Sequence, residues 1–222
     1  CGFPGEHADD PSRMASLLPK LAHLQPPTGI FEVQIHRFAP FHTDSSGRGI
    51  GPIRPAKPYR HVYALPEKTL DRIAYYFERT EPHSPPNVVP LADAITKWRM
   101  IASRGDEILL ALDTPDALHI RDSRACRTAS THRLTGFERN VYLACDAPLL
   151  PKEIAERLNT SVESVQKAAA VLEDHALLLS LDNRLLALAV RIPQDESSPD
   201  HQLDVAEEIH HARARDLFHR GS

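Results

Sequence analysis

The chain has 222 residues, of which 41% are hydrophobic and 25% charged, and its net charge is -4. These values are ordinary for a soluble globular protein of one or two domains and provide no general attraction to nucleic acid or anionic membranes. No apolar run approaches the roughly 20 residues of a membrane span, and residues 1–20 lack a signal-peptide pattern. Three scattered cysteines predict a reducing, cytoplasmic setting.

The first predicted element follows a Gly-Phe-Pro-Gly turn at residues 2–5, a turn of the kind that normally follows a strand. Asp10-Pro11 predicts the start of a helix whose apolar stripe lies within residues 14–21. Pro19 is expected to bend this helix, and the Pro-Pro-Thr-Gly sequence at 26–29 is expected to end it.

Residues 30–38, Ile-Phe-Glu-Val-Gln-Ile-His-Arg-Phe, alternate between apolar and polar side chains and predict a strand. One face carries Phe31, Val33 and Ile35, and the other carries Glu32, Gln34 and His36. The pattern fits a half-exposed antiparallel strand. It also fits a barrel strand whose polar face lines an open, ligand-holding lumen.

Residues 39–63 are rich in Gly and Pro, lack periodicity and predict a long loop. The loop and the residues just before it form the most basic part of the chain, with Arg37, Arg48, Arg54, Lys57 and Arg60. Such cations either grip a phosphate, a carboxylate or an acidic peptide, or are simply solvated.

The next signals predict two helices and a hairpin. Pro66 and Pro90 each open a helical pattern, and the apolar stripe of the first runs to Phe77. Two apolar runs flank residues 113–116, Asp-Thr-Pro-Asp, as expected for a hairpin.

Residues 130–192 predict a helix, a helix–turn–helix and a hairpin about Asp182-Asn183, which is the order of a winged helix. Thr135 and Thr160 each begin a capping-box pattern. The candidate recognition helix has a single basic residue, Lys167, among acidic ones. Because duplex binding relies on Lys and Arg, this composition argues against a DNA-binding regulator and favours a protein-contacting module.

Local chemistry does not name a reaction. The histidines show no zinc spacing, and the sequence contains no nucleophile elbow, Walker loop or dinucleotide motif. Cys126 lies between Arg124 and Arg127, which either favours its thiolate or leaves it an incidental loop cysteine. Cys145 is expected in the core.

An ordered set of motifs within residues 2–78 nevertheless resembles one family. These motifs are GFPGE, HLQPPTG, IHRFAPFH, GIGPIRPAKPYRHVYALP and RIAYYFE, and IRDSR and NRLLALAV follow later in the chain. The set is similar to the cobalamin-dependent radical SAM enzymes known as RiPP maturation radical SAM C-methyltransferases. The resemblance covers most of the chain except the tail.

The resemblance implies an α/β (α+β) fold. It places the C-terminal portion of a partial β/α barrel with a substrate-side loop at 1–63 and a helical and hairpin connector at 64–129. A winged-helix-like domain would follow at 130–192, and a mostly disordered tail with a weak helix near 204–218 at 193–222.

The implied parent enzyme methylates a ribosomally synthesised precursor peptide, using S-adenosylmethionine, a 4Fe-4S cluster and cobalamin. The family's Cys-x-x-x-Cys-x-x-Cys motif and cobalamin domain are missing from these 222 residues. The chain is therefore expected to be a C-terminal fragment that is inactive by itself. The alternative is a stand-alone winged-helix module that recognises the leader of a precursor peptide without catalysis.

The resemblance also implies site residues, although it assigns no catalytic one. Gly2, Gly5 and Glu6 match a cofactor-facing turn, with Glu6 near S-adenosylmethionine. The residues expected to line the substrate are Glu32, Gln34, His36, Arg37, Phe38 and Pro40. This chain has Ala39 and Phe41 where the family commonly has Ser and Tyr, which weakens the case for specific polar contacts there.

Overall fold

A computed structural model describes residues 1–81, 86–193 and 198–219. The fold is mixed α/β, as predicted, and no sheet closes into a barrel within these residues. The chain divides into two compact units. The first unit comprises Cys1–Ser16 and Pro27–Ala94, and the second comprises Leu17–Pro26 and Ile95–Ser222.

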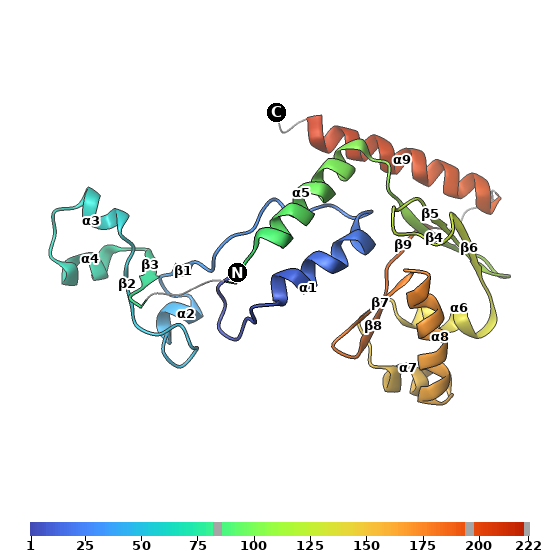
Figure 1. Cartoon of the computed structure of the whole chain (residues 1–222), viewed down its shortest axis with the longest axis horizontal. Helices are drawn as coiled ribbons and strands as arrows, with labels where there is room; N and C mark the ends of the chain where they lie inside the picture. The colour runs from blue at the N-terminus through green and yellow to red at the C-terminus, as the bar shows by residue number, and fades with distance from the viewer. Residues whose placement is uncertain (82–85, 194–197, 220–222) are drawn as a thin grey trace. The chain divides into compact units, whose positions relative to one another are not determined.

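The first unit contains a small antiparallel sheet in the order β1-β3-β2 (Figure 1). Its strands are β1 (Ile35–His36), β2 (Ile53–Pro55) and β3 (Tyr76–Arg79). The short helices are α2 (Pro40–Thr43), α3 (Pro58–Val62) and α4 (Glu67–Ile73). The small core beneath the sheet consists of Ile35, Ile50, Ala74 and Phe77.

The strand predicted over residues 30–38 is much shorter than expected. It stops after His36, because Phe38 turns the chain with a φ of 70°. It starts only at Ile35, because the Val33 N–H donates to the Cys1 carbonyl instead of pairing with β3. The predicted apolar face is correct for the buried Ile35 and wrong for Phe31, which is 66% exposed.

Two other predictions in the first unit are corrected. The supposed long loop contains α2, β2 and α3, and Pro40 and Pro58 occupy the first turns of the two helices. The helix opened by Pro66 ends at Ile73, so Phe77 is buried from strand β3 rather than from a helix.

Two of the boundaries between the units fall within helices, because the chain changes unit after Ser16 and after Ala94. The predicted first helix is α1 (Asp10–Leu17), and it tightens into the 3-10 helix η1 (Leu18–Leu21), where Pro19 lies. Helix α5 (Val89–Arg104) agrees with the helix predicted at Pro90, and its Leu91, Ile95 and Trp98 are buried as its stripe requires.

The second unit is built on a sheet in the order β6-β5-β4-β9. The predicted hairpin joins β4 (Leu109–Asp113) to β5 (Leu118–Asp122), followed by β6 (Thr131–Leu134) and, parallel to β4, β9 (Val190–Arg191). Leu109 and Ala111 of β4 face the main core, whereas Leu110 and Leu112 face Leu203. Burial on both faces explains why β4 is almost continuously apolar.

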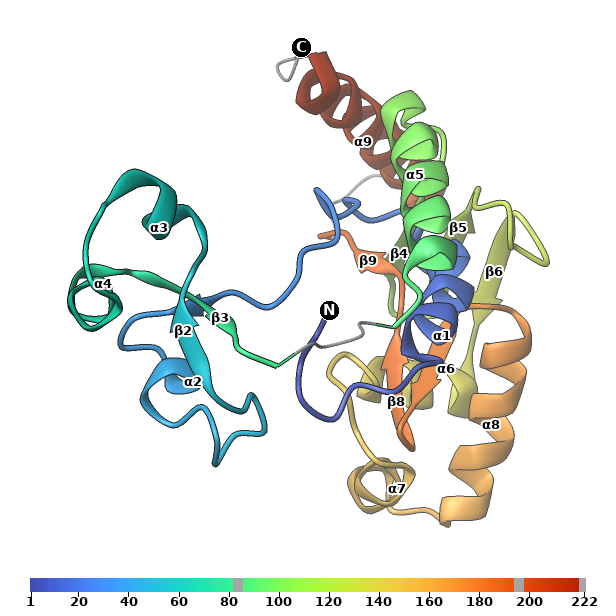
Figure 2. The same cartoon turned by 60° about the vertical axis from the view of Figure 1, so that its left-hand side comes forward.

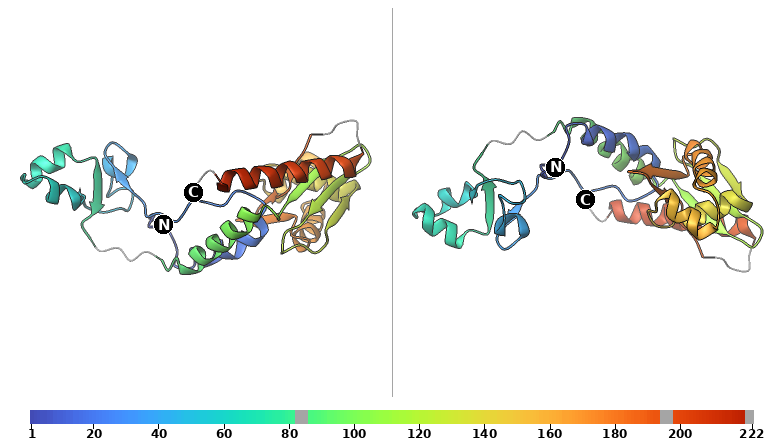
Figure 3. Two further views of the ribbon diagram at one scale, coloured as in Figure 1. Left: turned by 90° about the horizontal axis from the view of Figure 1, so that it is seen from above. Right: turned by 90° about the horizontal axis from the view of Figure 1, so that it is seen from below.

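Leu203 belongs to helix α9 (Pro199–His219), which lies along this sheet (Figure 3). The helix is longer than the one predicted near 204–218. Residues 194–197 and 220–222 of the predicted disordered tail lie outside the described part of the chain. No described helix is long and apolar enough to cross a membrane.

The other face of the sheet shares one hydrophobic core with helices α6 (Gly136–Ala144), α7 (Pro151–Leu158) and α8 (Val162–Asp174). Helices α7 and α8 pack against each other below the sheet in Figure 2. A hairpin follows, formed by β7 (Leu178–Leu181) and β8 (Arg184–Ala187). Leu149 adds an antiparallel bridge to Leu185 on the free side of β8.

Local signals in this region are largely confirmed. Asp182 and Asn183 both have positive φ, 49° and 59°, as a two-residue hairpin turn requires. The N-cap of α8 is Ser161, whose Oγ accepts the Ser164 N–H, so the predicted cap at Thr160 is wrong by one residue. At α6, Thr135 is the N-cap without a side-chain hydrogen bond, so its capping box is not formed.

Candidate functional site in the first unit

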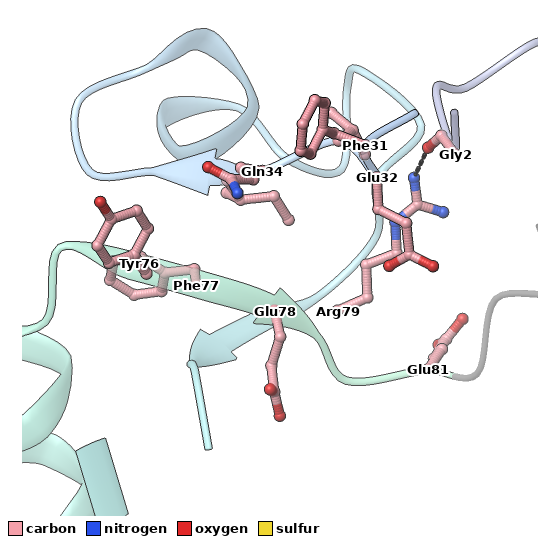
Figure 4. Close-up of a pocket in the computed structure, with 11 residues that line it drawn as sticks. Gly2, Phe31, Glu32, Gln34, Tyr76, Phe77, Glu78, Arg79 and Glu81 are labelled. Carbon is pink, nitrogen blue, oxygen red and sulfur yellow. Dashed lines mark hydrogen bonds between the residues drawn. The ribbon is translucent and has the colours of Figure 1, made fainter. Parts of the chain in front are cut away.

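A cavity of about 440 Å³ opens between strand β3 and the extended segment 31–35 (Figure 4). Ligand pockets in proteins span about 300–1,000 Å³, so this cavity has the size of a binding site. Its lining residues are Gly2, Phe31, Glu32, Val33, Gln34, Ile35, Tyr76, Phe77, Glu78, Arg79 and Glu81.

The cavity exists because two strands part. Strands β1 and β3 pair at Ile35 with Phe77 and at His36 with Tyr76, and the same register would next bring Val33 opposite Arg79. Instead the Val33 N–H donates to the Cys1 carbonyl at 2.8 Å. Segment 31–34 therefore leaves β3, and the opening between them forms the cavity.

The first residues of the chain contact both sides of this opening. The Cys1 backbone nitrogen donates to the Phe31 carbonyl at 2.7 Å, which together with the Val33 bond is the pattern of neighbouring parallel strands. From the other side, the Arg79 guanidinium donates to the Gly2 carbonyl at 2.5 Å, the bond drawn in Figure 4.

The cavity wall is rich in carboxylates. Burial opposes ionisation of Glu78, but hydrogen bonds from the Lys57 N–H (3.1 Å) and the Arg54 guanidinium (2.9 Å) outweigh it. The pKa of Glu78 is consequently lowered, and this carboxylate is ionised and already paired at neutral pH. Glu32 and Glu81 are exposed at the cavity.

The residues expected to contact a cofactor form a self-contained turn. Gly2 and Gly5 have φ of 83° and 85°, a conformation that glycine adopts without steric cost. The Glu6 carboxylate accepts the Gly2 N–H at 2.5 Å and so closes the turn from inside. Gly2 lines the cavity, whereas Gly5 and Glu6 lie outside its lining.

The six residues expected to line the substrate divide into two groups. Glu32 and Gln34 line the cavity, and His36, Arg37, Phe38 and Pro40 lie outside its lining. The His36 ring contacts Gln34 Oε1 at 3.0 Å. Arg37, the residue after β1, donates to the carbonyls of Asp71 and Ala74 at the end of α4. These hydrogen bonds connect the end of β1 to that helix.

Phe38 combines strain with exposure. Its φ of 70° is uncommon for a bulky residue, yet its side chain is 79% exposed. Its N–H donates to His42 Nδ1 at 3.4 Å, and the neighbouring Pro40 starts α2. Strain of this kind persists where the surroundings impose it and gathers at functional positions, so Phe38 remains a candidate contact residue.

Five lining residues come from β3 and the turn after it: Tyr76, Phe77, Glu78, Arg79 and Glu81. The sequence pattern placed Phe77 on a helix and did not indicate the other four. The helical stripe predicted to run to Phe77 concealed them. The alternation over 76–79 is too short to signal a strand, so no pattern in the sequence indicated that these residues face segment 31–34.

Other candidate groups are accounted for by the structure. In the basic loop, Arg54 and Arg60 form ion pairs with Glu78 and Glu67. Burial raises the pKa of the Cys126 thiol despite the nearby Arg124, and its Sγ donates to the Pro19 carbonyl at 3.2 Å. Of the two alternatives for Cys126, the raised pKa favours the incidental loop cysteine over the thiolate.

The residues that the structure describes do not fit an iron–sulfur cluster. Within residues 1–81, 86–193 and 198–219, no three His, Cys, Asp or Glu side chains are grouped to hold a metal ion. Of the three cysteines, Cys145 is buried in the core of the second unit. No cluster-dependent step is therefore assigned to residues of this chain.

No family model matches the chain, and neither a curated protein nor a solved structure does.

Proposed function

We propose that this chain forms the C-terminal part of a cobalamin-dependent radical SAM methyltransferase that modifies a ribosomally synthesised precursor peptide. The observation that carries the proposal is the parallel-type hydrogen bonding of Cys1 with residues 31–33. Helix α1 lies between these two segments in the sequence. Parallel neighbouring strands joined through a helix are the repeating unit of a β/α barrel.

The rest of the chain supports the same assignment. The order α6, α7, α8, β7, β8, with the Leu149–Leu185 bridge beside β8, is that of a winged-helix-like domain. In the first unit, Glu32 and Gln34 line the cavity next to the glycine turn, where the family resemblance places substrate and cofactor. The parent enzyme's bound S-adenosylmethionine, cluster and cobalamin would supply the radical and the methyl group in the cytoplasm.

A direct test is reconstitution of the isolated chain with iron, sulfide and S-adenosylmethionine under reducing, anaerobic conditions. We expect no 5'-deoxyadenosine above the level of a protein-free control, because the cysteine triplet of the family is missing from these residues. Rapid release of 5'-deoxyadenosine, measured by chromatography, would contradict the assignment of cofactor cleavage to another part of the parent.

The parent itself is tested by sequencing the coding DNA upstream of the Cys1 codon. An in-frame Cys-x-x-x-Cys-x-x-Cys preceded by a cobalamin-domain pattern supports the proposal. A start codon directly upstream overturns it and favours the second candidate, a stand-alone peptide-binding module.

One observation favours that second candidate. Among the described residues β7 pairs only with β8, so its outer edge is open to strand addition. In the two-residue hairpin, Leu181 and Arg184 form the hydrogen-bonded pair next to the turn, so the Ser180 N–H points outward.

Replacing Ser180 by proline should therefore block strand addition while sparing the β7–β8 ladder. For a leader peptide bound at this edge, we expect a loss of affinity of about tenfold. Fluorescence anisotropy with a labelled precursor leader measures the change, and Ser180→Ala is the matched control. Equal binding by both variants would remove this edge as the leader site.

A further inference from the structure

We propose that the cavity of the first unit binds an extended peptide as an added strand along the Arg79 edge of β3, with a lysine or arginine of that peptide placed between Glu32 and Glu81. The inference rests on the proposed function for the source of the peptide. It adds how the peptide is held and which side-chain chemistry is selected.

The first support is the open backbone edge of β3. The Ala56 N–H donates to the Tyr76 carbonyl at 3.0 Å, and the Thr80 N–H donates to the Pro52 carbonyl at 2.9 Å. The even-numbered residues of β3 therefore turn their backbone groups toward β2, and the odd-numbered ones turn toward the β1 side.

At Phe77 the β1 side is occupied by Ile35. At Arg79 the register would place Val33, but the Val33 N–H is bonded to Cys1. The backbone N–H and C=O of Arg79 therefore point into the cavity. Main-chain groups at such an edge are what an extended peptide recognises when it adds to a sheet.

The second support is the shape and surface of the walls. Tyr76 is 48% exposed and Phe31 is 66% exposed. Figure 4 shows Tyr76 toward one end of the cavity and Phe31 toward the other. Aromatic side chains placed this way bury peptide side chains at a low entropic cost, while the strand edge holds the backbone.

The third support is charge. Glu78 is neutralised by Arg54, whereas the Arg79 guanidinium donates to the neutral Gly2 carbonyl and keeps its positive charge. Within the described part of the chain, Glu32 and Glu81 take part in no ion pair. Because the Arg79 guanidinium offsets one of these two negative charges, a cationic side chain compensates the remaining one, whereas an acidic side chain adds to it and is repelled.

The experiment uses the whole chain and three fluorescein-labelled pentapeptides in low-salt anisotropy titrations. The probes are Val-Thr-Lys-Thr-Val, the same peptide with Glu in place of Lys, and the Lys peptide N-methylated at alternate residues. We expect the Lys peptide to bind at least about fivefold more tightly than the Glu peptide. The N-methylated peptide should lose at least about tenfold, because it cannot donate to the strand edge.

Matched variants locate the site. Glu32→Gln and Glu81→Gln should each reduce the preference for Lys over Glu, and the double variant should abolish it. Glu67→Gln is the control, because Glu67 is an exposed carboxylate of the same unit outside the cavity lining. Circular dichroism of each variant verifies that the fold is retained.

Equal affinity for the N-methylated and parent peptides overturns strand addition, and an unchanged Lys preference in the double variant overturns the charge assignment. Neither result depends on S-adenosylmethionine or on the upstream coding sequence. Failure here is therefore distinguishable from failure of the proposed enzyme function.

Discussion

Replacing Arg124 by methionine is expected to lower the free energy of unfolding by about 3–5 kcal/mol, since it leaves a buried carboxylate without its counter-charge. Arg124 and Asp122 are both fully buried, and the guanidinium contacts the carboxylate through Nε (2.9 Å) and Nη2 (2.7 Å). The same guanidinium donates to the carbonyls of Lys20 (2.6 Å) and Ala176 (2.7 Å).

These bonds explain the large effect. Lys20 belongs to η1, Asp122 ends β5, and Ala176 follows α8, so a single side chain joins three segments distant in sequence. Without Arg124, the Asp122 carboxylate has no counter-charge and the Lys20 and Ala176 carbonyls lose their hydrogen-bond donor in the core of the second unit. The Ile-Arg-Asp-Ser-Arg motif at 120–124 therefore has a structural role in this chain.

Urea unfolding followed by Trp98 fluorescence measures the change, because the Trp98 indole is buried in the same unit and donates to the Ala22 and Leu24 carbonyls. The control is Arg133→Met, which removes an exposed pair with Asp116 and should cost less than about 1 kcal/mol. Adding Asp122→Leu to Arg124→Met should restore part of the loss. Equal effects of the two single variants would contradict the structural role.

The second large effect is a pH dependence of stability that comes from His23. Its pKa is lowered from 6.5 to about 4, because burial penalises the imidazolium and the Arg124 guanidinium repels it. The ring donates from Nε2 to the Leu188 carbonyl at 2.9 Å. Its Nδ1 is buried and finds no hydrogen-bond partner among the described residues, so a second proton would be uncompensated there.

The sign follows from the two pKa values. Above pH 6.5 the imidazole is neutral in both states; between pH 6.5 and about 4 the unfolded chain binds a proton that the folded chain does not. The free energy of unfolding therefore decreases as the pH is lowered from 6.5 to about 4. His23 contributes about 3 kcal/mol to this decrease.

Unfolding free energies of the native chain and of His23→Gln, measured across this pH window, isolate the effect. The unfolding free energy of the glutamine variant should decrease less over this window, by the contribution of about 3 kcal/mol from His23. The reason is that the glutamine amide still reaches the Leu188 carbonyl but does not titrate. His7→Gln is the matched control, because it removes an exposed histidine in place of the buried one. Parallel profiles for native protein and His23→Gln would rule His23 out as the source.

Local sequence signals determined several elements correctly. The Asp182-Asn183 turn, the β4–β5 hairpin and the helix near Pro90 are all present. Each depends on residues close in sequence, through turn geometry, proline placement or apolar periodicity. These local interactions do not depend on residues distant in sequence, so they predict the element before the tertiary structure is known.

The candidate site was only partly determined in this way. Glu32 and Gln34 were named from the alternation of one segment and the family resemblance, and both line the cavity. Tyr76 and Arg79 on the opposite wall were hidden within an apparent helical stripe. Their position depends on antiparallel pairing with residues about forty positions earlier, which no local pattern encodes.

Only the tertiary structure decided where the strand predicted at 30–38 begins and ends and what charge each buried group carries. The hydrogen bond from Val33 to Cys1 separates that strand from β3 and so creates the cavity. Burial beside Arg124 keeps His23 neutral, and no pattern in the sequence indicated that this histidine is buried. Periodicity encodes which residues lie inside, whereas pairing across the fold sets which backbone groups and charges remain available to a ligand.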